Sequence, residues 1–81
     1  MSGRDIVKEK VFEIVAERLG KKKEELTEPM TFVTDLAADS LDQVELIMEL
    51  EEKFDLNIPE EEAKAIETIG DAIKYIEEHT Q

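Results

Sequence analysis

The chain has 81 residues, enough for one domain with a small core and too few for a deep preformed catalytic cleft. It contains no cysteine, which excludes a disulfide framework, a thiolate nucleophile and a cysteine-based metal site. Its formal net charge of −12 makes nucleic acid and anionic membranes poor candidates as partners, because a strongly negative chain repels both.

The N-terminal half predicts one amphipathic helix followed by a long loop. Over residues 6–19, apolar side chains recur at helical spacing, at Val7, Val11, Ile14, Val15 and Leu19. Gly20 follows the last of them and suits a left-handed helix C-terminus. Residues 21–39 show no sustained period, so we expect a long ordered loop held by Leu26, Phe32, Val33 and Leu36. A loop of this length in a compact domain is usually functional.

Three further helices are predicted in the C-terminal half. One covers residues 40–54 and ends before Pro59, because the residue before a proline avoids helical angles. Pro59 then opens a short helix over residues 60–65. Thr68 and Asp71 have the spacing of a capping box and start a last helix, which extends to about residue 78. The predicted fold class is all-α: a small four-helix bundle of three main helices and one short helix, with the long loop between the first and the second.

The helix over residues 40–54 carries two apolar faces. Successive residues are rotated by about 100° around a helix. One face therefore holds Gln43, Leu46, Ile47, Leu50 and Phe54, and the roughly opposite face holds Leu41, Val44 and Met48. Acidic residues, Glu45 and Glu52 among them, surround the second and narrower face. This face either packs against the long loop or forms an apolar patch with an acidic rim, which would dock basic partner proteins.

The negative charge is concentrated around this helix. Eleven of the 22 acidic residues lie between Asp35 and Glu62, where Lys53 is the only base. Solubility alone does not require such a concentration, so the distribution favours basic partner proteins or cations. An acidic cation-binding module is therefore a rival hypothesis. We predict no specific metal site, because Asp35, Asp39 and Asp42 do not follow the spacing of a calcium-binding loop.

Ser40 stands where the long loop enters this helix. Asp39 is a good N-cap and Asp42 completes a capping-box spacing, so Ser40 is either one more residue of the cap or a site of modification. Its hydroxyl would face solvent beside backbone N–H groups without helical partners, where the helix dipole favours a phosphodiester. We predict no catalytic residue, because the sole histidine, His79, lies near the C-terminus and no nucleophile-elbow motif is present.

Four segments extend the pattern around Ser40: FVTDLAADSLDQVEL at residues 32–46, MELEEKF at 48–54, IPEEEA at 58–63 and DAIKYI at 71–76. Together they closely resemble acyl carrier proteins of dissociated (type II) fatty acid synthesis. The resemblance covers nearly the whole chain and implies a single acyl-carrier domain over residues 1–81. The chain departs from the pattern at Ala37, where many relatives have glycine, and at the three lysines of residues 21–23.

The resemblance implies that a phosphopantetheinyl transferase moves 4′-phosphopantetheine from coenzyme A to Ser40, and that acyl groups then travel as thioesters on the thiol of this arm. The absence of cysteine fits a borrowed thiol. By the same resemblance, Asp39 and Leu41 flank the serine for the transferase. The surface presented to fatty acid synthesis enzymes, through their basic docking patches, consists of Leu41, Val44, Glu45, Met48 and Glu52. The family shelters acyl chains between its helices, and the residues that would line this space stay open.

We therefore expect a carrier rather than an enzyme: a monomeric, cytoplasmic phosphoprotein. The N-terminus lacks the apolar stretch of a signal peptide, and no run approaches the ~20 apolar residues that cross a bilayer, so we expect no membrane insertion. A carrier of another pathway, loaded with polyketide, aminoacyl or D-alanyl groups, would share the fold and the arm, and is the alternative.

Overall fold

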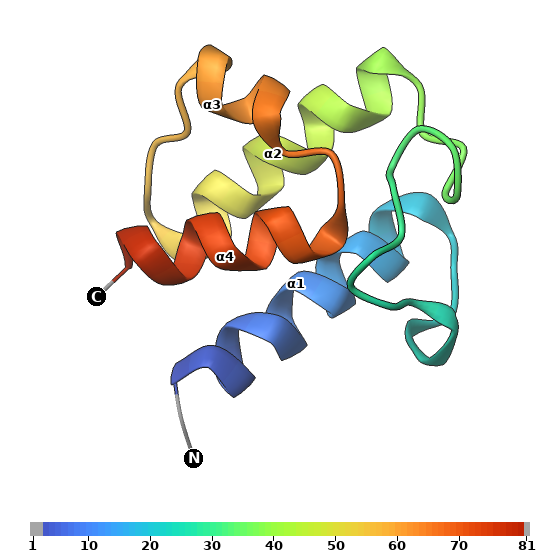
Figure 1. Cartoon of the computed structure of the whole chain (residues 1–81), viewed down its shortest axis with the longest axis horizontal. Coiled ribbons are helices and arrows are strands. Elements are labelled where there is room, and N and C mark those ends of the chain that lie inside the picture. Colours follow the sequence, from blue (N-terminus) through green and yellow to red (C-terminus); the bar gives the residue numbers. More distant parts are fainter. Residues whose placement is uncertain (1–2, 81) are drawn as a thin grey trace.

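Four α-helices make up the architecture of the computed structural model, which describes residues 3–80 and, from residue 6 onward, their side chains (Figure 1). The main helices are α1 (Gly3–Leu19), α2 (Ser40–Phe54) and α4 (Ile69–His79), and α3 (Glu60–Ala65) is short. The predicted all-α class, the four helices and the long loop between α1 and α2 are confirmed. Two details differ: α1 begins at Gly3 rather than at residue 6, and a 3₁₀ turn, η1 (Lys23–Glu25), lies in the loop.

Signals in the local sequence account for the helix ends. Gly20, at φ 67°, ends α1 in the left-handed conformation, and the next N–H, of Lys21, donates to the carbonyl of Ala16 at 2.9 Å. At the start of α4, the Thr68 hydroxyl accepts from the N–H of Asp71 at 3.0 Å, and the Asp71 carboxylate accepts from the N–H of Thr68 at 3.2 Å. The predicted glycine C-terminus and capping box are both confirmed.

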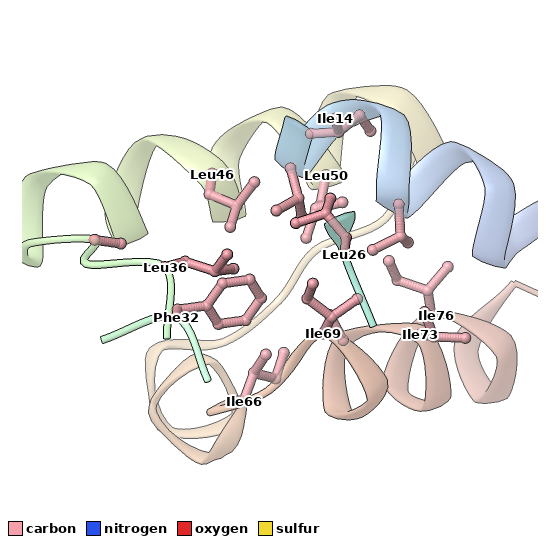
Figure 2. Packing of buried hydrophobic residues seen from close by; sticks show 14 of the residues in the cluster. Ile14, Leu26, Phe32, Leu36, Leu46, Leu50, Ile66, Ile69, Ile73 and Ile76 are labelled. Atoms are coloured by element: carbon pink, nitrogen blue, oxygen red, sulfur yellow. The ribbon is translucent and has the colours of Figure 1, made fainter. Parts of the chain in front are cut away.

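The core lies where α1 packs against both α2 and α4. Figure 2 shows side chains of α2, of α4 and of the loop pointing into one cluster. The buried members are Val7, Val11, Ile14, Val15, Leu26, Phe32, Leu36, Ala38, Leu46, Leu50, Ile58, Ile66, Ile69, Ala72, Ile73 and Ile76. Removing apolar surface from water contributes roughly 25 cal/mol per Å², so this cluster is the main source of stability.

The long loop is tied to the start of α4 by its backbone. The N–H of Phe32 donates to the carbonyl of Glu67 at 3.0 Å, and the N–H of Ile69 donates to the carbonyl of Met30 at 3.1 Å. These bonds flank an isolated antiparallel bridge between residues 31 and 68. The loop side chains Leu26, Phe32 and Leu36 are buried as predicted. The loop is therefore an ordered part of the domain that brings the chain to the first residue of α2.

The prediction that Val33 holds the loop is wrong, because its side chain is 62% exposed. The residues around it form a tight turn, in which the N–H groups of Asp35 and Leu36 each donate to the carbonyl of Thr31 at 3.1 Å. The Asp35 carboxylate closes the turn by accepting from the N–H of Thr31 at 2.8 Å. The turn directs the side chains of Phe32 and Leu36 into the core and leaves Val33, in the middle of the turn, exposed to solvent.

Candidate functional site

Ser40 is the first residue of α2, and its side chain is exposed. The preceding residue, Asp39, is the N-cap: its carboxylate accepts from the N–H of Asp42 at 2.9 Å, and the Asp42 carboxylate accepts from the N–H of Asp39 at 3.2 Å. The capping box predicted here is confirmed. The N–H groups of Ser40 and Leu41 lie in the first turn of α2, outside the capping box, and therefore have no acceptor within the helix.

The backbone just before Ser40 adopts a conformation that is rare for its residue type. Ala37 has φ 54°, in the left-handed region, which costs a residue with a side chain roughly 1–2 kcal/mol. The next residue, Ala38, is buried, and its N–H donates to the carbonyl of Phe32 at 2.8 Å. The sequence departs from glycine at the position where the loop turns back toward α2, and glycine adopts such a φ without strain.

Among the residues whose side chains the structure describes, no group is placed to activate Ser40 as a nucleophile. None of the hydrogen bonds among residues 3–80 involves its hydroxyl. The histidine, His79, lies at the end of α4, where its Nδ1 is 2.7 Å from the carbonyl oxygen of Tyr75 and its ring stacks on the Tyr75 ring. Within the same described range, no three histidine or acidic side chains gather in a way that could hold a metal ion.

A hollow of about 540 Å³ opens beside Ser40, between α2 and α3. Its lining residues are Phe32, Ser40, Gln43, Val44, Leu46, Ile47, Met48, Ile58, Glu60, Ala63, Lys64 and Ile66. They include buried side chains, such as Leu46 and Ile66, and exposed ones, such as Ser40 and Met48, so the hollow runs from the surface toward the core. The sequence left these lining residues open, because several of them face one another only after α2 and α3 have packed. The part of the lining from residues 58–66 depends on how α3 folds back over α2.

The second apolar face of α2 is open to solvent. Leu41 is 67% exposed and Val44 and Met48 are each 55% exposed, whereas Leu46 on the inner side is 1% exposed. The alternative in which this face packs against the long loop is therefore wrong, since the buried side chains of the loop join the core on the other side of α2. Glu45 is half-buried and Glu52 is exposed, and both follow a residue of the apolar face by four positions, which places them beside it.

A cation from α1 lies against the acidic edge of this face. In Arg18, Nη2 is 2.7 Å from Oε1 of Glu49, and Nη1 is 3.6 Å from Oε1 of Glu45. The hydrogen bond to Glu49 raises the pKa of Arg18, and the negative charges of both glutamates add to this effect. Sequence spacing does not predict this contact, because Arg18 and Glu49 are 31 residues apart and no local pattern connects them.

Comparisons with known proteins agree with this fold and site. Residues 9–76 match a family model described as a phosphopantetheine attachment site. The chain is 49% identical over 73 residues to an acyl carrier protein of Clostridium perfringens, a match that covers 90% of this chain and 96% of that protein. The solved structure of an acyl carrier protein from Enterococcus faecalis superposes with a TM-score of 0.78 at 36% identity, over 94% of this chain and 95% of that one. A solved structure from Mycobacterium tuberculosis has a TM-score of 0.82 at 31% identity, over 88% of this chain and 95% of that one.

The resemblance predicted from the sequence is thus confirmed over most of the chain, and with it the non-catalytic class and the prosthetic group. Among the described residues, no helix combines the length and the apolar character needed to cross a membrane. The chain belongs to the acyl carrier proteins, which are non-catalytic carriers that hold acyl chains on 4′-phosphopantetheine and interact with a phosphopantetheinyl transferase and with enzymes of fatty acid synthesis.

Proposed function

We propose that Ser40 is the residue that carries 4′-phosphopantetheine and that the chain delivers growing acyl chains to the enzymes of fatty acid synthesis. The observation that supports this best is the position of Ser40: an exposed hydroxyl at the first residue of α2 and at the opening of an apolar hollow. It is also the only serine within residues 3–80. Once bound, the prosthetic group supplies a terminal thiol that forms thioesters with acyl groups, a function that no residue of this cysteine-free chain can provide.

The surroundings of Ser40 suit a covalent attachment more than a bound anion. The N–H groups of Ser40 and Leu41 and the helix dipole favour a negative group at this end of α2. The carboxylates of Asp39 and Asp42 stand at the same end and oppose it. Because the two effects act against each other, the covalent bond is what keeps the group in place. The exposed side chains of Asp39 and Leu41, on either side of the serine, are in our proposal the ones that the transferase contacts.

The test is the intact mass of the chain after incubation with coenzyme A and an active phosphopantetheinyl transferase. We expect the wild type to gain one phosphopantetheine and Ser40→Ala to gain none. Thr34→Ala is the matched control, because it removes another exposed hydroxyl from the segment that leads into α2, and it should be modified like the wild type. An unmodified wild type, beside a known carrier that the same transferase does modify, would show that the proposal is wrong.

We propose that the hollow between α2 and α3 receives the acyl chain. Its lining is mostly apolar, and each methylene buried there would contribute ~0.8 kcal/mol. Support comes also from α3, which has no buried residue of its own. A wall that is packed so lightly can move outward at low cost when the hollow fills.

The partner enzymes dock, in our proposal, on the outer face of α2, which we call the docking face: Leu41, Val44, Glu45, Met48 and Glu52. Its support is the exposure of three large apolar side chains beside acidic ones, a combination that suits a partner with an apolar contact ringed by lysine or arginine. The charges would mainly speed the encounter and orient the complex, and the apolar side chains would add most of the affinity. Met48 suits contact with several different enzymes, because its flexible thioether adapts to different surfaces.

We further propose that residues 1–81 act as one carrier domain, as a monomer and in the cytoplasm. The hydrophobic cluster that joins α1, α2, α4 and the long loop supports the first point. The assignment to fatty acid synthesis rather than to a polyketide, aminoacyl or D-alanyl pathway is supported by the identity to the Clostridium perfringens protein. Loading of the modified chain with a malonyl group by the fatty acid synthesis transferase, and not with an amino acid by an aminoacyl-adenylating enzyme, separates fatty acid synthesis from the aminoacyl and D-alanyl pathways.

A further inference from the structure

We propose that Arg18 is a built-in competitor for the cations of basic partners, and that it thereby sets how strongly they bind to the docking face. The inference rests on the docking face proposed above. Arg18 belongs to α1, outside the docking face. Its guanidinium nevertheless forms ion pairs with the carboxylates of Glu45 and Glu49, along one edge of that face. A partner lysine or arginine that approaches Glu45 therefore meets a carboxylate that already has a cation.

The geometry of the contact is that of a specific ion pair rather than of non-specific electrostatic attraction. Glu45 and Glu49 are one helical turn apart on α2, and one guanidinium reaches both, with a hydrogen bond of 2.7 Å to Glu49 and a separation of 3.6 Å from Glu45. The planar fork of arginine, with separate N–H donors, makes such a double contact possible, whereas an ammonium is a single point charge. The contact to Glu49 is the shorter one, so a partner cation can displace Arg18 from Glu45 more easily than from Glu49.

The degree of burial makes the pair exchangeable. The side chain of Arg18 is 35% exposed, that of Glu45 43% and that of Glu49 30%, so water and a partner can reach all three. Ion pairs at such sites shift an equilibrium by up to about fivefold. A competitor of this strength modulates partner binding without preventing it.

The other acid of the docking face lacks such a competitor. Among the ion pairs between described residues, none involves Glu52. A partner cation can therefore pair with Glu52 directly, whereas it must displace Arg18 to pair with Glu45. A partner that docks on this face places cations on both acids, so it is weakened at Glu45, and the effect grows with its dependence on Glu45. Arg18 is in this sense a residue that determines which basic enzymes the carrier prefers.

The test measures kcat and KM of a phosphopantetheinyl transferase with the full-length unmodified chain as substrate. Arg18→Gln should lower KM about two- to fivefold and leave kcat unchanged, because it frees Glu45 without altering Ser40. Arg18→Lys keeps the positive charge but loses the forked pair of N–H donors, so its KM should lie between those of the wild type and Arg18→Gln. Lys10→Gln is the matched control: it changes the net charge equally on the same helix, and Lys10 pairs with none of the α2 carboxylates in the described chain, so KM should change less.

Two other roles for Arg18 predict different results. If Arg18 only repels cations through its charge, Arg18→Gln will still lower KM when Glu45 and Glu49 are both changed to Gln, whereas competition predicts no further effect in that background. If Arg18 instead holds Glu45 in the orientation that partners need, Arg18→Gln will raise KM. Either result, or an unchanged KM, overturns the inference.

A second variant separates failure of this inference from failure of the docking face itself. Glu52→Lys should raise KM if the transferase uses that face. If Glu52→Lys raises KM while Arg18→Gln fails to lower it, the competitor role alone is wrong. If Glu52→Lys also leaves KM unchanged, the docking face is wrong and the competitor role falls with it. Far-ultraviolet circular dichroism of every variant checks that the helices are intact.

Discussion

The molecule has a closed half and an open half. In the closed half, between α1 and α4, six apolar residues have no exposed surface: Val11, Val15, Ile69, Ala72, Ile73 and Ile76. In the open half, around the outer side of α2 and the short α3, apolar side chains line a hollow of about 540 Å³ or project into solvent. The same residue types therefore stabilise the fold where they are packed and stay available to acyl chains and partner proteins where they are not.

The open half is tethered rather than packed. α3 has six residues, too few to be stable as an isolated helix, and none of them is buried. It is held from both sides by the chain next to it, where Ile58 and Ile66 enter the core. The N–H of Ile58 also donates to the carboxylate of Glu51 at 2.8 Å. Local opening needs least free energy where few buried contacts are lost, so α3 is the element expected to move first.

The largest expected difference between the two halves appears within α2 itself. Leu50→Ala removes a fully buried side chain and should lower the free energy of unfolding by ~2–5 kcal/mol. Met48→Ala, two residues away on the exposed side, should change it by less than about 0.5 kcal/mol. Urea denaturation followed by circular dichroism measures both. Similar losses for the two variants would mean that the outer face is packed after all, and the division into halves would fail.

A second prediction concerns the hollow. Attachment of an acyl chain should stabilise the wild type, by ~0.8 kcal/mol for each methylene that enters, so three buried methylenes would add about 2.4 kcal/mol. Ala63→Leu places a larger side chain in the lining and should remove much of this gain. Ala65→Leu is the control, because that residue is exposed on the same helix and is not part of the lining.

The measurement is the difference in thermal stability between the acylated and the unacylated form of each variant. Comparing each variant with itself cancels the effect of the substitution on the fold, including any strain from overpacking. Equal gains in the wild type and in Ala63→Leu would show that the acyl chain stays outside this hollow. The open half would then serve partners alone.

A third prediction concerns the segment that enters the open half. Ala37→Gly should raise the free energy of unfolding by about 0.5–1 kcal/mol, because relief of the left-handed strain exceeds the extra entropy that glycine loses on folding. Ala38→Gly is the control: this neighbour is buried and has no positive φ, so the change should destabilise. If both glycine variants destabilise to the same extent, Ala37 carries no strain of this kind.

The parts of the fold that the sequence predicts are those specified by neighbouring residues. Asp39 with Asp42, Thr68 with Asp71, and Gly20 mark helix ends through contacts within a few positions, so these ends could be predicted. The exposure of Val33 could not, because an isolated apolar residue in a loop has no period that assigns it a side.

The site divides in the same way. The place of Ser40 at the start of α2 and the second apolar face follow from spacing within one helix, whereas the exposure of that face is known only from the structure. The Arg18 contact and the hollow depend instead on how helices far apart in sequence pack, and 31 positions separate Arg18 from Glu49. Alternation and spacing within one element carry no information about such contacts.

The prediction with the smallest effect at neutral pH concerns the boundary between the two halves, at Tyr75 of α4. Burial of its hydroxyl, followed by interaction with the Glu62 carboxylate of α3 and the charge of Glu51, raises the pKa of Tyr75 to about 12. An unfolded chain has a tyrosine pKa of about 10. The folded chain therefore keeps a proton that the unfolded chain releases. The resulting stability is complete below about pH 10 and is lost as the pH rises toward 12.

Tyr75 is the only tyrosine and the chain has no tryptophan, so the ultraviolet absorbance of tyrosinate titrates this one residue. In the folded wild type the titration should have its midpoint well above that of the same chain in urea. Glu62→Gln should move the folded midpoint down, because it removes a charge that opposes ionisation, and Glu61→Gln, its exposed neighbour on α3, should move it less. If the midpoint in a chain that is still helical equals the midpoint in urea, Tyr75 is open to water. In that case α3 does not cover Tyr75, and this side of α4 is exposed to solvent like the open half.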